Sequence, residues 1–258
     1  SDLILAVGSS LSPGRFSHGI PNAVNKTIIH CTVDELHVNK SYPTAVALIG
    51  DARFALQALE EELSDKTSGN GRAPGSVAAE VTSSRDSAMV QYREAMASTD
   101  TPINPYRVYA GLMDVLDPLN SFVTHESGNT RDQLSTVYDT LVPRGFLGWG
   151  NVSSLGFSLA ATIAAKISFP QKHCVAVTGE AGLGYMMGNL EVPLRQKLGI
   201  TVAHVSNGGF AGYGPGFWGD GHDPFTHKVL GNDEVDMSQV IGALGYHTER
   251  VTEPSEVG

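Results

Sequence analysis

Residues 174–210 read CVAVTGEAGLGYMMGNLEVPLRQKLGITVAHVSNGGF, and this stretch decides the predicted fold. The run 174–177 is short, apolar and β-branched, as buried strands are. A helical segment is predicted over 188–198, closed by Gly199, and a second buried strand over 201–206. A strand, a crossover helix and a second strand form a βαβ unit. The expected fold class is therefore α/β with parallel strands and a right-handed connection.

Polar residues follow each predicted strand at its carboxyl end, the edge where open α/β sheets bind ligands. Glu180 lies in the turn after the first strand and Asn207 after the second. The side-chain oxygens of Glu180 and Asn207, together with the backbone carbonyl of Gly209, would suit Mg²⁺. This ion usually binds phosphates of the ligand as well. The N–H groups of Ala181 and Gly182 would suit a phosphate. The alternative is a pair of ordinary turns in a Rossmann-like sheet, since glycine-rich turns after strands are common.

The same stretch resembles the signature of thiamine diphosphate (ThDP) enzymes, which begins Gly-Asp-Gly and ends Asn-Asn. Here Gly179-Glu180-Ala181 is followed by 25 residues and then by Asn207-Gly208. Glutamate in place of aspartate keeps the charge and lengthens the arm by a methylene. The resemblance implies a cofactor diphosphate held through Mg²⁺, with Glu180, Asn207 and Gly209 as metal ligands.

Two further motifs carry the resemblance. The run 126–130, ESGNT, is similar to the first diphosphate-side loop of oxalyl-CoA decarboxylases and 2-hydroxyacyl-CoA lyases. The run 148–156, GWGNVSSLG, resembles the turn that holds the cofactor's aminopyrimidine. By this resemblance, the backbone carbonyl of Leu155 would accept a hydrogen bond from the aminopyrimidine. The cofactor-binding residues implied by all the motifs are Glu126, Gly128, Asn129, Ser154, Leu155, Ala181, Gly182, Asn207 and Phe210.

The first 65 residues predict part of another α/β domain. Strands are expected over 2–8, 27–33 and 45–49, followed by a helix over 52–63 that Asp51 caps. The runs 29–34, IHCTVD, and 40–43, KSYP, resemble the end of the central domain of acetolactate synthase-like enzymes. That domain binds FAD or ADP in some members and nothing in others. Gly8 and Asp34 are the residues that would serve a nucleotide, and a turn glycine with a strand-end acid is the plainer interpretation.

Three segments organise the chain: 1–65, the C-terminal part of a central domain; 66–103, a linker with a helix over 77–97; and 104–258, a Rossmann-like ThDP diphosphate and Mg²⁺ domain expected to lack its C-terminal end. Asn104 and Pro105 predict a helix start. The remaining expected elements of the third segment are a helix over 106–116, a strand over 121–124, helices over 157–167 and 237–244, and a strand over 247–251.

Composition limits the classes of partner. A net charge of −10 argues against nucleic acid and anionic membranes. No apolar run reaches the roughly 20 residues of a membrane span. Cys31 and Cys174 lie in apolar strand-like runs and are interpreted as core residues in a reducing compartment, without a disulfide. A cytoplasmic protein is expected, and the resemblance implies a homo-oligomer.

The resemblance implies a ThDP- and Mg²⁺-dependent decarboxylase or carboligase acting on 2-oxo acids, a lyase or transferase like acetolactate synthase. The alternatives are an enzyme of the acyl-CoA branch, a degenerate homologue without catalysis, and a plain nucleotide-binding Rossmann domain. The family's cofactor-activating glutamate lies in an N-terminal domain that these residues do not include. No catalytic residue is therefore assigned, and the chain alone is expected to be inactive.

Overall fold

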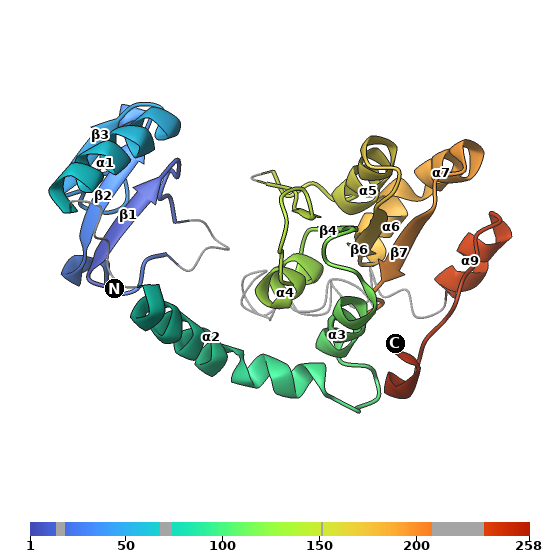
Figure 1. Cartoon of the computed structure of the whole chain (residues 1–258). Coiled ribbons are helices and arrows are strands. Elements are labelled where there is room, and N and C mark those ends of the chain that lie inside the picture. The colour runs from blue at the N-terminus through green and yellow to red at the C-terminus, as the bar shows by residue number, and fades with distance from the viewer. Residues whose placement is uncertain (14–18, 68–73, 151, 208–234) are drawn as a thin grey trace, which may run out of the picture. The chain divides into compact units, whose positions relative to one another are not determined.

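The computed structural model describes residues 1–13, 19–67, 74–150, 152–207 and 235–258. The chain divides into two compact units, Ser1–Glu80 and Val81–Gly258 (Figure 1). The predicted linker over 66–103 is largely one helix, α2 (Pro74–Met96), and the division between the units lies within it.

The first unit is built on a parallel sheet of order β1-β2-β3. Its elements are β1 (Leu3–Val7), β2 (Thr27–Thr32), β3 (Val46–Ile49), α1 (Ala52–Thr67) and two 3-10 turns, Ala23–Asn25 and Glu35–His37. The central strand β2 is the most buried of the three, with Ile28 and Cys31 each 1% exposed. As predicted, the Asp51 carboxylate accepts from the N–H of Arg53 at 2.9 Å at the start of α1.

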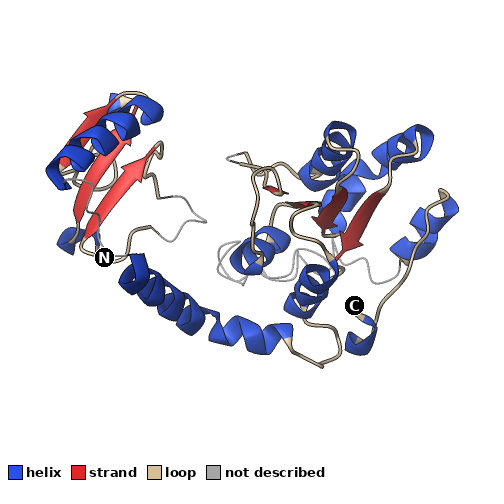
Figure 2. Ribbon diagram, viewed as in Figure 1, coloured by secondary structure: helices blue, strands red, loops and turns tan. Residues whose placement is uncertain are grey.

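The second unit contains a four-stranded parallel sheet of order β5-β4-β6-β7 (Figure 2). Its strands are β4 (Ser121–His125), β5 (Phe146–Leu147), β6 (His173–Thr178) and β7 (Ile200–His204). Every residue of β4 is buried, and so is β6 after its first residue. Central strands covered on both faces have this pattern in parallel sheets, which confirms the expected fold class.

Helices cover both faces of this sheet. Val123, Val175 and Val177 point to one face, where they pack with residues of α3 (Pro105–Val115), α4 (Asn129–Val137) and α2. Phe122 and Cys174 point to the other face, where α5 (Phe157–Ser168) lies. Successive side chains of a strand point to opposite faces, so β4 and β6 each serve two cores.

The crossover from β6 to β7 is helical from Glu180 onward, which corrects the helix predicted over 188–198. It consists of α6 (Glu180–Met186), a 3-10 turn (Met187–Leu190) and α7 (Glu191–Gln196). Gly179 has extended backbone as the N-cap of α6, so the helix begins directly after the strand. Lys197 ends α7 in the left-handed conformation, with φ 54°, two residues before the glycine expected to end it.

Other predicted elements are confirmed or corrected. Asn104 caps α3 by accepting from the N–H of Tyr106 at 3.0 Å, as expected. Helix α9 (Met237–Ala243) lies where a helix was predicted. The strand predicted over 247–251 is wrong: the chain there is irregular until a 3-10 turn at Pro254–Glu256. It forms no ladder with any described strand, so its backbone lacks the pairing that makes a strand. Helix α4 and strand β5 were not predicted.

Candidate functional site

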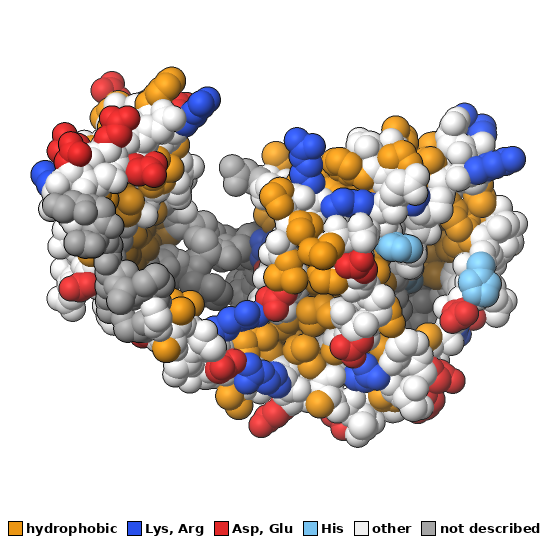
Figure 3. Space-filling model, viewed as in Figure 1, with side chains coloured by type: hydrophobic (Ala, Val, Ile, Leu, Met, Phe, Trp, Pro, Cys, Tyr) orange, Lys and Arg blue, Asp and Glu red, His pale blue; other side chains and the backbone are white. Residues whose placement is uncertain are grey.

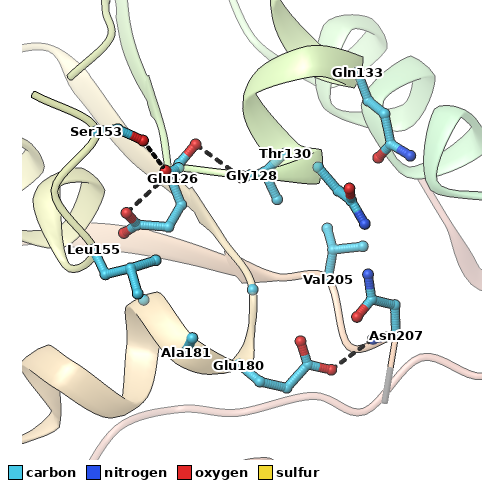
Figure 4. A pocket seen from close by; sticks show the side chains of 14 residues that line it. Glu126, Gly128, Thr130, Gln133, Ser153, Leu155, Glu180, Ala181, Val205 and Asn207 are labelled. Carbon is cyan, nitrogen blue, oxygen red and sulfur yellow. Dashed lines mark hydrogen bonds between the residues drawn. The ribbon is translucent and has the colours of Figure 1, made fainter. Parts of the chain in front are cut away.

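The four strands of the sheet β5-β4-β6-β7 lead into one pocket of about 210 Å³ at its carboxyl edge (Figure 4). The strand ends are level because β4, β6 and β7 pair in register, with His125 opposite Val177 and Thr178 opposite His204. The lining residues are Glu126, Ser127, Gly128, Asn129, Thr130, Gln133, Ser153, Leu155, Gly179, Glu180, Ala181, Gly182, Val205 and Asn207.

The segments after β6 and β7 meet through Glu180. Its Oε1 accepts from the backbone N–H of Asn207 at 2.6 Å and from the Ser206 hydroxyl at 3.1 Å. Glu180 is the first residue of α6, where the helix dipole favours a negative charge. The parallel pairing of β6 with β7 thus brings together two residues that are 27 positions apart in the sequence.

The segment after β4 is held by Glu126, which is only 1% exposed. Its carboxylate accepts from the N–H of Ser127 at 2.9 Å and from the hydroxyl of Ser158, at the start of α5, at 3.0 Å. Gly182 of α6 lies so close that a Cβ there would be 2.3 Å from Glu126 Cγ. The carboxylate therefore joins the loop after β4 to the starts of α5 and α6.

The N-terminus of α4 also borders the pocket. Gly128 precedes the helix with φ 90° and ψ −141°, a conformation that favours glycine. Asn129 and Thr130 are the first helical residues, and the Thr130 hydroxyl donates to the carbonyl of Glu126 at 3.1 Å. A helix N-terminus at a pocket wall favours an anionic ligand.

The segment after β5 supplies Ser153 and Leu155. The Ser153 hydroxyl lies 2.5 Å from the Ser127 hydroxyl, which links the loops after β5 and β4. Gly156 then precedes α5 with φ 88°, and a Cβ there would be 2.3 Å from Met186 Cγ. Glycine is therefore required at this turn for its conformation as well as for space.

Two histidines lie beside the pocket without lining it. Burial lowers the pKa of His125, although a hydrogen bond between Nδ1 and the carbonyl of Glu126 at 3.0 Å opposes the shift. Burial also lowers the pKa of His204, and the nearby Glu180 carboxylate opposes that shift. Both imidazoles are thereby held toward the neutral form near pH 7.

The pocket's donor atoms suit a hard cation carried by an anionic ligand. Glu180 and Asn207 offer a carboxylate and an amide, both oxygen donors. Among the described residues, no group of three His, Cys, Asp or Glu side chains could hold a metal by itself. A site with few protein ligands fits Mg²⁺, which usually takes one or two carboxylates and completes its shell with phosphates and water.

Comparison with known families agrees with this geometry. Residues 126–258 match the family model for the C-terminal TPP-binding domain of thiamine pyrophosphate enzymes, and residues 1–59 match the model for their central domain.

The chain belongs to the thiamine pyrophosphate enzymes.

Thiamine pyrophosphate is ThDP under another name. The chain is 27% identical to a probable acetolactate synthase large subunit of Methanococcus aeolicus, over 78% of this chain and 34% of the relative. It is 24% identical to oxalyl-CoA decarboxylase of Escherichia coli K12, over 86% and 38%. It is 25% identical to 2-hydroxyacyl-CoA lyase of Oryza sativa subsp. japonica, over 95% and 42%. The chain therefore spans 34–42% of the lengths of these ThDP-enzyme relatives.

The pocket brings together most residues that the motifs implied. They are Glu126, Gly128, Asn129, Leu155, Glu180, Ala181, Gly182 and Asn207. Ser154 is exposed and does not line the pocket. Gly209 and Phe210 lie outside the described residues.

Six lining residues were not among the predicted site residues: Ser127, Thr130, Gln133, Ser153, Gly179 and Val205. All except Gln133 lie within or beside the recognised motifs. Gln133 lies one helical turn beyond Asn129, so a prediction of α4 would have placed both on one face.

A second pocket, of about 150 Å³, lies in the first unit at the carboxyl ends of its strands. Its lining includes Gly8, which has φ 66°, and Asp34, whose carboxylate accepts from the N–H of Leu36 at 3.0 Å. Asp34 also lies 3.4 Å from Nε2 of His37. The two residues singled out for a nucleotide therefore share a pocket.

The prediction that both cysteines are core residues is confirmed. Cys31 and Cys174 are both buried and free. None of the described helices has the length and apolar character needed to cross a membrane.

Proposed function

We propose that the pocket of the second unit binds ThDP together with Mg²⁺. The observation that carries the proposal is the contact between Glu180 and the backbone of Asn207 at the ends of adjacent parallel strands. Glu180 and the amide of Asn207, with the carbonyl of Gly209, would hold the metal. The N–H groups of Ala181 and Gly182 would bind the diphosphate.

The other walls of the pocket would orient the rest of the cofactor. Leu155 lies on the segment between β5 and α5. Its backbone carbonyl would accept a hydrogen bond from the aminopyrimidine. Gly128 and Asn129 would contact the diphosphate beside the N-terminus of α4. Glu126 would act by holding these walls together. The bound cofactor supplies an electron sink for a carbanion, and these residues bind it, orient it and fix its metal.

Calorimetric titration of ThDP with and without Mg²⁺ tests this proposal, with Glu180→Ala as the decisive variant. Binding should require Mg²⁺ and weaken at least about tenfold in the variant, since an ionic ligand to the metal is lost. Glu191→Ala is the matched control, because it removes the same charge from an exposed position on α7. Undiminished binding by Glu180→Ala would reject the metal role. No binding by the full-length protein would reject the cofactor site and favour the degenerate homologue.

We propose further that the whole protein is an acetolactate synthase-like decarboxylase or carboligase of 2-oxo acids. The similarity to acetolactate synthase subunits supports this choice. The acyl-CoA branch is the second candidate, supported by the run 126–130 and by the two relatives named for CoA substrates. Assays of the full-length protein with panels of 2-oxo acids and acyl-CoA thioesters separate them. Turnover of thioesters alone would reject the first choice.

The remaining proposals concern assembly, the first unit and the domain limits. We propose a homo-oligomer, supported by exposed apolar side chains of the second unit such as Val115 and Leu141, at 63% and 64%. Figure 3 shows hydrophobic side chains gathered on the visible face of the second unit.

We propose FAD or ADP as the ligand of the first unit's pocket. We propose that 1–65 and 104–258 are the two domains and that the protein is located in the cytoplasm.

A further inference from the structure

Gln133 reaches the pocket from the second turn of α4, and no sequence motif pointed to it. Figure 4 shows it on the same side of the pocket as Val205 and Asn207, away from Leu155, which would hold the aminopyrimidine. This side contains the N-terminus of α4 and the proposed metal ligand Asn207. Gln133 therefore lies at the end of the pocket that would receive the diphosphate.

Tyr109 of α3 forms a hydrogen bond with the side chain of Gln133. Tyr109 is 0% exposed, and its hydroxyl donates to Oε1 of Gln133 at 2.9 Å. A buried hydroxyl proton needs an acceptor, and Oε1 is the acceptor of the amide. The contact therefore sets which way the amide faces. Burial also raises the pKa of Tyr109, so the phenol keeps its proton at neutral pH.

The amide nitrogen of Gln133 is consequently left for the pocket. With Oε1 turned to Tyr109, Nε2 and its two N–H groups point elsewhere. Within the described part of the chain, Nε2 makes no hydrogen bond. Gln133 is half-buried and lines the cavity, so these N–H groups can donate to an oxygen of a ligand.

We infer that Gln133 is a phosphate-binding residue. Its amide, oriented by Tyr109, donates a hydrogen bond to the terminal phosphate of the cofactor. This inference rests on the proposed ThDP site and adds a residue to it. A neutral amide suits this place because the metal and the helix N-terminus already balance charge on the diphosphate. Tyr109 is a positioning residue, since it acts only through Gln133.

The experiment compares ThDP with thiamine monophosphate, both titrated calorimetrically into the chain with Mg²⁺. Gln133→Met removes the donors at similar volume. Its affinity for ThDP should fall about tenfold or more, the usual effect of losing a hydrogen bond to a charged group. Its affinity for the monophosphate should stay within about twofold, because that ligand lacks the terminal phosphate. Gln196→Met, at an exposed position on α7, is the control and should change neither affinity.

Tyr109→Phe tests the positioning role. It should weaken ThDP binding about threefold, and the double variant with Gln133→Met should bind no more weakly than Gln133→Met alone. Thermal unfolding of each variant checks that it is folded. Additive losses, or equal losses for the two thiamine phosphates, would overturn the role of Tyr109.

Three outcomes separate the inference from the proposal beneath it. A full-length protein that binds neither ligand rejects the ThDP site itself. A chain that binds ThDP, with Gln133→Met binding equally well, rejects only the inference. In the full-length protein, a raised KM for a carboxylate substrate without any loss of ThDP affinity would reassign Gln133 to the substrate.

Discussion

At the scale of single residues, the site depends on close approaches that leave no room for substitution. Glu126 shows this most clearly, because one buried carboxylate receives hydrogen bonds from two segments and packs against Gly182 of a third. The motif suggested a ligand-binding role for Glu126. Its carboxylate accepts hydrogen bonds from Ser127 and Ser158, and a buried polar group needs such donors.

Two glycines of α6 provide a matched pair of variants. Gly182→Ala should destabilise the second unit by about 1–3 kcal/mol, because its Cβ would overlap Glu126 in a packed core. Gly184→Ala should be neutral or stabilise by up to about 1 kcal/mol, because nothing lies within 4 Å of its Cβ and alanine favours helix. Denaturant unfolding measures both. Equal effects of the two substitutions would contradict the close approach.

At the scale of elements, β4, β5 and β6 each deliver one segment to the pocket, and the helix after each strand fixes that segment. Strands β4 and β6 are followed almost directly by α4 and α6. The segment after β5 is longer and reaches α5 through Ser153 and Leu155. Short βα connections therefore place the polar residues more tightly than their separation in the sequence would suggest.

The cap of α9 gives this helix a dependence on pH. Asp236 accepts from the hydroxyl and N–H of Ser238, and Arg250 lies 3.1 Å away. The Ser238 hydroxyl is the main cause that lowers the pKa of Asp236 to about 2, and Arg250 adds to it. A lowered pKa in the folded state means that the carboxylate stabilises the fold fully above its unfolded value of 3.8.

The stability difference between the unaltered chain and Asp236→Ala should therefore shrink as pH falls from 5 toward about 2. Urea unfolding at a series of pH values measures it. Asp236→Asn can cap a helix without titrating. Its free energy of unfolding should therefore differ from that of Asp236→Ala by the same amount at every pH. A difference that grows with acidity would show that the carboxylate does not act as this cap.

At the scale of the whole molecule, the two units each have a pocket at the carboxyl edge of a parallel sheet, where α/β sheets bind ligands. The family models divide in the same way, with one for each unit. The proposed Mg²⁺ and nucleotide ligands would therefore be bound by separate sets of residues.

The nucleotide proposal for the first unit is tested by titrating ADP and FAD. An acidic residue after a strand commonly binds a ribose hydroxyl, so Asp34→Ala should weaken binding about tenfold. Asp65→Ala, an exposed position on α1, is the control for charge. If neither ligand binds, or if both variants bind as the unaltered chain does, the pocket has no such role.

The sequence by itself determined the α/β class, the parallel βαβ unit and most of the residues around the pocket. These follow from local patterns: apolar runs of strand length, glycine-rich turns, and motifs that the chain shares with ThDP enzymes. The caps at Asp51 and Asn104 were predictable for the same reason, since a cap depends only on neighbouring residues.

Only the tertiary structure decided what each side chain does there. The burial of Glu126, the bond from Tyr109 to Gln133 and the exposure of Ser154 depend on contacts between distant segments. The strand predicted over 247–251 is absent for the same reason, because a strand needs a partner and not only a suitable sequence. Local pattern limits the backbone, whereas packing between elements sets the direction and environment of each group.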